Sequence, residues 1–111
     1  MALYGITDRS QILDAQAVKA ACNMIDSAAE DFATAAKKLE EAKNEIGGKA
    51  MKVDGQTMED SYKIVKEGLE NVKTNINAYT QQVINTANAI STAQQNEYLD
   101  YIEQQKRQAN Q

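Results

Sequence analysis

The chain has 111 residues, 42% of them apolar, which is enough for one domain with a small core. Twelve basic and sixteen acidic residues give a net charge of −4. Lys and Glu are interleaved, and no basic block can follow a phosphate backbone, which argues against a nucleic acid as the partner. Histidine, the usual general base near neutral pH, does not occur, so we expect a non-enzymatic protein with no cofactor or metal.

The N-terminal residues lack the basic start and the continuous apolar core of a secretory signal peptide. No apolar run approaches the roughly 20 residues of a membrane span. We therefore expect a cytoplasmic protein without a membrane span, or one secreted without a cleaved signal peptide. Cys22 is the single cysteine, so it cannot form an internal disulfide, and we expect it to be a small buried thiol.

Long helices are predicted because the chain has no proline and four of its five glycines lie outside the periodic segments or at their ends. Asp8 can cap the first helix, with Gln11 reaching back to complete a capping box. Gly47 and Gly48 favour the left-handed positions that end a helix. The predicted single domain, 1–111, consists of a helix over 8–46, a turn over 47–56, a helix over 57–104 and a frayed tail over 105–111.

Heptad spacing is the strongest signal in the first predicted helix, where large apolar residues recur every seven positions. This large row is Val18, Ile25, Phe32, Leu39 and Ile46. Small residues follow it in two rows, which are Ala21, Ala28, Ala35 and Ala42, and Cys22, Ala29 and Ala36 before Lys43. Small residues beside the large row allow the backbone of a partner helix to approach closely.

The second predicted helix carries two rows of large residues that can fill the space left by those alanines. They are Met58, Val65, Val72 and Tyr79, and Tyr62, Leu69, Ile76, Val83 and Ile90. The predicted fold is all-α, an antiparallel helical hairpin. We expect the rows of large apolar residues on both helices, which we call the seams, to turn inward. Such a hairpin leaves the flanks of its seams exposed, and we expect this of Ala29, Ala36, Ile64 and Ile84. Dimerisation would cover them in a four-helix bundle.

Two features beyond the seams have two interpretations each. Tyr98, Leu99, Tyr101 and Ile102 form an apolar patch near the C-terminus, which serves a partner or packs against the N-terminal residues. Those N-terminal residues are Leu3, Tyr4, Ile6, Ile12 and Leu13. Gly68, inside the second helix, either allows a partner to approach or is a tolerated glycine on an exposed face.

The chain resembles the small helical-hairpin proteins of the WXG type, which belong to type VII secretion systems. The resemblance rests on the length, the capped first helix, the glycines of the central turn and the long second helix, and it covers the whole chain. The family's Trp-x-Gly motif is replaced here by Ile46-Gly47-Gly48 or Val53-Asp54-Gly55. Counting four residues on from Tyr98 or Tyr101 gives no acidic residue, so the family's export motif is absent as well.

The resemblance implies an adaptor or co-secreted partner protein that binds a helical protein, such as the N-terminal helices of an LXG toxin. We expect the partner interface on the two seams and the C-terminal patch. Its predicted residues are Val18, Ile25, Phe32, Leu39, Ile46, Tyr62, Leu69, Ile76, Val83, Ile90, Tyr98, Tyr101 and Ile102. The alternatives are a self-assembling structural protein, as a homodimeric bundle or a filament subunit, and a regulator or inhibitor of an enzyme.

Overall fold

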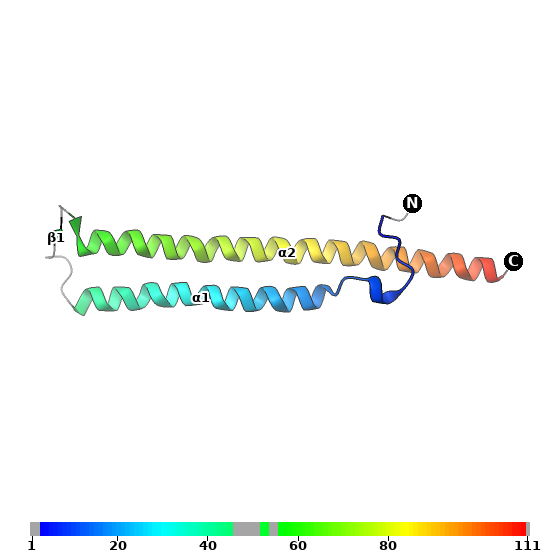
Figure 1. Cartoon of the computed structure of the whole chain (residues 1–111), viewed down its shortest axis with the longest axis horizontal. Helices are drawn as coiled ribbons and strands as arrows, with labels where there is room; N and C mark the ends of the chain where they lie inside the picture. Colours follow the sequence, from blue (N-terminus) through cyan, green and yellow to red (C-terminus); the bar gives the residue numbers. More distant parts are fainter. Residues whose placement is uncertain (1–2, 46–51, 54–55, 111) are drawn as a thin grey trace. The chain divides into compact units, whose positions relative to one another are not determined.

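The computed structural model describes residues 3–45, 52–53 and 56–110. A short 3-10 helix η1 (Arg9–Gln11) precedes the long helix α1 (Ala15–Glu45). Two-residue strands β1 (Lys52–Val53) and β2 (Gln56–Thr57) pair antiparallel before helix α2 (Met58–Ala109). The fold is the predicted all-α helical hairpin, with α1 and α2 in opposite directions (Figure 1).

The first long helix begins later than the sequence predicts. The capping box at Asp8 is present, because the Ser10 N–H donates to the Asp8 carboxylate and the Gln11 side chain accepts from the Asp8 N–H. It opens only η1, which ends at the extended residue Ile12. A second cap, Asp14, then accepts a hydrogen bond from the Ala17 N–H at 3.0 Å and starts α1. The predicted start at residue 8 is therefore wrong.

The second helix is longer than predicted. Residues 105–109, expected to fray, continue α2, and Arg107 pairs with Glu103 one turn earlier at 2.7 Å. Gln, Lys, Arg and Ala are strong helix formers, and the basic residues of the last turn suit the negative end of the helix dipole. Ile46, Gly47 and Gly48 lie outside the described residues.

The chain divides into two compact units. Unit 1 joins residues 1–22 to residues 81–111, and unit 2 is the continuous stretch 23–80. The prediction of a single helical-hairpin domain over the whole chain stays a prediction. Among the described residues, no helix is long and apolar enough to cross a lipid bilayer.

Unit 2 packs α1 against α2 through small side chains. Ala29 and Ala36 are buried to 1% and 5% exposure, and on α2 Tyr62 and Thr80 are buried as well. The inward row of α1 is therefore the small one, and the prediction that these alanines stay exposed is wrong. Alanine on the inside lets two helices approach closely, and it leaves the larger neighbours at the edge of the contact.

Unit 1 holds a second small core. Cys22, predicted to be a buried thiol, is 4% exposed, and Ile84, Ala87 and Ser91 are buried on α2. The burial of Ile84 contradicts its predicted exposure. Ile6 is also buried, because Gly5 adopts a positive φ of 65° that turns the N-terminal residues back onto the helix.

Candidate partner-binding interface

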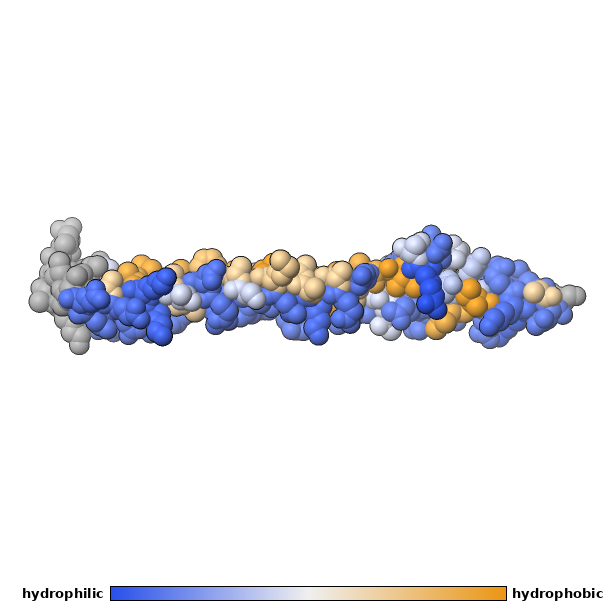
Figure 2. Space-filling model, turned by 90° about the horizontal axis from the view of Figure 1, so that it is seen from below, coloured by the Kyte–Doolittle hydropathy of each residue, from blue (hydrophilic) through white to orange (hydrophobic). Residues whose placement is uncertain are grey.

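Large apolar side chains of unit 2 are exposed on one side of the hairpin, which we call the apolar face. Ile25 and Phe32 of α1 are 50% and 36% exposed, and Tyr79 of α2 is 67% exposed. Over unit 2, Figure 2 shows apolar side chains along the upper edge of the view and polar ones along the lower edge. The apolar face consists of Ile25, Phe32 and Leu39 of α1 and of Val65, Val72 and Tyr79 of α2.

Helix geometry puts both halves of this face on the same side. Each residue advances by about 100°, so Phe32 lies about 60° from the buried row that contains Ala29. On α2 the exposed row is rotated around the helix axis from the buried Tyr62 and Thr80 by a similar or slightly larger angle. This row is Val65, Val72 and Tyr79. Because the helices run antiparallel and the offset has the same sense in each, the two exposed rows point to one face.

The opposite side of unit 2 carries the polar contacts that join the helices. The Thr80 hydroxyl donates to the Asp26 carboxylate at 2.6 Å, and Lys73 pairs with Glu30 at 3.0 Å. Both contacts pair a residue of α1 with one of α2, so they define the register of the antiparallel pair. An exposed ion pair such as Lys73–Glu30 contributes about 0–1 kcal/mol, so it orients the hairpin more than it stabilises it.

A polar cluster occupies the end of unit 2 near the strands. Lys43 continues the alanine row inward and is only 9% exposed, with its ammonium 4.6 Å from the centre of the Tyr62 ring and 3.9 Å from Glu59. Burial raises the pKa of the Tyr62 phenol, the nearby Glu40 carboxylate raises it further, and Lys66 opposes both. The phenol therefore stays neutral at physiological pH. The Lys43 ammonium lies over its ring, and this cation–π contact stabilises the buried charge.

The N-terminal segment packs on the C-terminal part of α2 in unit 1. The Tyr4 N–H donates to both carboxylate oxygens of Glu97, at 3.0 and 3.1 Å, and the Leu13 N–H donates to the Gln94 side chain at 2.6 Å. Arg9 lies over the Tyr98 ring at 5.6 Å. The structure thus favours intramolecular packing for this patch, and Tyr98, Tyr101 and Ile102 are half-buried while Leu99 is 60% exposed.

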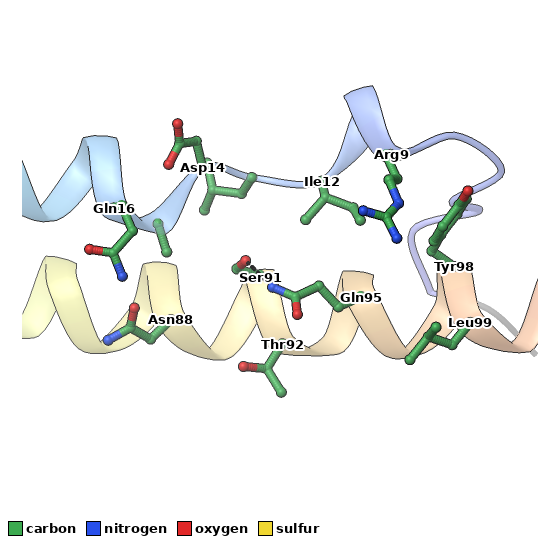
Figure 3. Close-up of a pocket in the computed structure, with 12 residues that line it drawn as sticks. Arg9, Ile12, Asp14, Gln16, Asn88, Ser91, Thr92, Gln95, Tyr98 and Leu99 are labelled. Atoms are coloured by element: carbon green, nitrogen blue, oxygen red, sulfur yellow. Dashed lines mark hydrogen bonds between the residues drawn. The ribbon is translucent and has the colours of Figure 1, made fainter.

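A hollow of about 590 Å³ remains under the extended segment before α1 (Figure 3). Ile12 points into it from the N-terminal segment, and Ser91 and Gln95 border it on α2. The Gln95 amide donates to the Ser91 hydroxyl, so this polar pair is already satisfied. Within the described part of the chain, no three acidic or cysteine residues come together to hold a metal ion.

The predicted interface residues fall into four groups. Ile25, Phe32 and Val83 are exposed, Tyr62 is buried, and Ile46 lies outside the described residues. The half-buried ones are Val18, Leu39, Leu69, Ile76, Ile90, Tyr98, Tyr101 and Ile102. On α2 the more exposed row is Val65, Val72 and Tyr79, which the sequence reveals as a heptad row but which we did not predict as an interface.

Gly68 adds a further observation on α2. A Cβ atom placed on it would meet no atom within 4 Å, so the packing of the described residues does not require glycine there. Around the helix it lies roughly 40–60° beyond Val72 and Val65, at the border of the apolar face.

No protein-family model, no curated protein and no solved structure matches the chain.

Proposed function

We propose that the chain is a non-enzymatic binding protein whose apolar face packs against two helices of a partner protein. The observation that carries the proposal is the exposure of Ile25, Phe32 and Tyr79 on one side of a hairpin in which α1 turns its alanines inward. Exposed apolar side chains in one continuous row are typical of an interaction site. Two partner helices on this face would complete a four-helix bundle.

The dimensions of the face suit such a complex. The part of α1 in unit 2 runs from residue 23 to 45, which at 1.5 Å per residue makes it about 35 Å long. Two helices side by side are about 20 Å wide, so the face covers roughly 700 Å². Stable specific complexes bury about 800 Å² per partner, so this face alone reaches the lower end of that range.

The composition of the face indicates the chemistry of the partner. Exposed Ala28, Ala35 and Ala42 flank the large residues on α1, and Gly68 borders them on α2. Small residues at a helix contact allow close approach of a partner that supplies large apolar side chains. We therefore assign as partner a helical hairpin whose seam is rich in Leu, Ile, Met or Phe.

The finer part of the proposal places the chain in type VII secretion, as an adaptor or co-secreted partner of a secreted substrate. Its support is architectural: the chain length, the hairpin of two long helices and the resemblance to the WXG-type proteins. The N-terminal helices of an LXG toxin are the partner we propose to test. In this complex the chain catalyses no reaction and contributes only helix packing.

Co-expression with such a toxin segment, followed by purification and native mass measurement, tests the proposal. Phe32→Asp places a carboxylate on the apolar face, and Thr34→Asp places the same charge on the exposed, opposite side of the same helix. Burying Phe contributes about 1.5–3 kcal/mol, so we expect Phe32→Asp to weaken the complex at least 10-fold. Thr34→Asp and Lys37→Ala should bind as the parent does. Equal binding by Phe32→Asp would show that the apolar face does not bind the partner. A stable homodimer that does not bind the toxin segment would favour self-assembly.

A further inference from the structure

One long stretch of α2 carries no charge. All twelve basic and all sixteen acidic residues of the chain lie outside residues 74–96. This stretch is a helix throughout, and many of its side chains are exposed amides or hydroxyls. Helix surfaces that face water normally carry Lys and Glu, and elsewhere in the described helices no stretch without charge is as long, so the absence of charge here calls for an explanation.

In unit 1 these uncharged side chains cover the side of α2 that points away from α1, which we call the neutral face. It consists of Gln82, Asn85, Thr86, Ala89, Thr92 and Asn96, all of them exposed. Ala89 lies about half a turn around the helix from the buried Ile84, Ala87 and Ser91. Figure 3 shows Thr92 pointing away from α1, on the far side of the helix.

We propose that the neutral face binds the neutral face of a second copy of this chain. In a two-fold symmetric pair the same patch meets itself, so a residue near the axis faces its own copy. A lysine or a glutamate there would face an identical charge, whereas an amide or a hydroxyl both donates and accepts hydrogen bonds and therefore complements itself. A partner of another sequence imposes no such condition, because it can match each charge with an opposite one.

The size of the neutral face makes this a weak association. From residue 82 to 96 the helix rises about 21 Å, and a single helix presents a face about 10 Å wide. The contact is therefore well below the roughly 800 Å² per partner of a stable complex. We expect weak association that appears only at high protein concentration and depends little on salt, since no ion pair contributes.

Paired charge variants provide the test. One variant carries Asn85→Lys and Thr92→Lys, and the other carries Asn85→Glu and Thr92→Glu. Lysine and glutamate are better helix formers than the residues they replace, so both variants should fold, as circular dichroism can verify. Sedimentation equilibrium up to about 1 mM then measures the mass of each variant alone and of their equimolar mixture. The same double Lys change at the exposed positions Gln105 and Gln108 is the control.

The parent and the control should dimerise with rising concentration, and each charged variant alone should stay monomeric. The mixture should dimerise again, at least 10-fold more tightly than either variant alone, because opposite charges now face each other. A monomeric parent, a Lys variant that dimerises like the parent, or a mixture that stays monomeric would each overturn the proposal. Phe32→Asp should leave this dimer intact, so the test is independent of the function proposed for the apolar face.

Discussion

Replacing Ala29 by leucine tests the inward row of α1. Ala29 is 1% exposed in the contact between α1 and α2, and the added three carbon atoms have no space there. Extra methylene groups in a well-packed contact cost about 1–3 kcal/mol, because the helices must separate or adopt strained rotamers. For a chain of this size each kcal/mol lowers the Tm by about 4–8 °C, so the Tm should fall by roughly 5–20 °C.

Ala28→Leu is the matched control, since Ala28 is the neighbouring residue on the same helix and is exposed. Surface changes of this kind usually alter stability by less than about 0.5 kcal/mol. Thermal unfolding followed by circular dichroism compares the two variants with the parent. Equal Tm values for Ala29→Leu and Ala28→Leu would show that the alanine row does not face α2, and the assignment of the apolar face would lose its basis.

Three further changes test other parts of the structure. Asp14→Ala removes the cap of α1 and should lower the free energy of unfolding by about 1 kcal/mol in urea titrations, while Asp14→Asn should restore most of it. Ile6→Ala should release the N-terminal segment, so amide exchange at Tyr4 and Leu13 should become faster while the middle of α1 keeps its protection. Tyr62→Phe tests the raised pKa: the folded state holds the phenol proton more tightly than the unfolded chain, so this contribution to stability is present below pH 10 and is lost as the pH rises above it. The parent should therefore lose stability above pH 10 more steeply than Tyr62→Phe, and parallel curves would show that the phenol is not perturbed.

The two helices and their antiparallel arrangement follow from the sequence, because proline is absent and the glycines gather near the middle of the chain. The start of α1 does not follow as easily. Asp8 and Asp14 are both good caps, but the first opens only a short turn that ends at the extended residue Ile12, and the second opens the long helix. Local propensity cannot distinguish the two, since packing of the N-terminal segment on α2 determines which one is used.

The inward row of each helix was the harder prediction. Heptad spacing identified rows of large and small residues on α1, and a large row such as that of Phe32 is the usual choice for the inside. The structure turns Ala29 and Ala36 inward instead, because Asp26 and Glu30 on the other flank reach α2. The buried alanine row of α1 lies between the apolar row of Phe32 on one side and the charged residues Asp26 and Glu30 on the other. The positions of these charged residues in the sequence could therefore have indicated which row faces inward.

Side-chain footprinting by hydroxyl radicals, with the chain alone and in complex with a helical partner, tests the central claim most directly. Phe32 and Tyr79 lie on the apolar face and react readily when exposed, and Tyr4, which is 39% exposed, lies in unit 1, outside that face. We predict that labelling of Phe32 and Tyr79 falls several-fold in the complex while Tyr4 is labelled as before. Unchanged labelling of Phe32 and Tyr79 in a complex that has formed would contradict it.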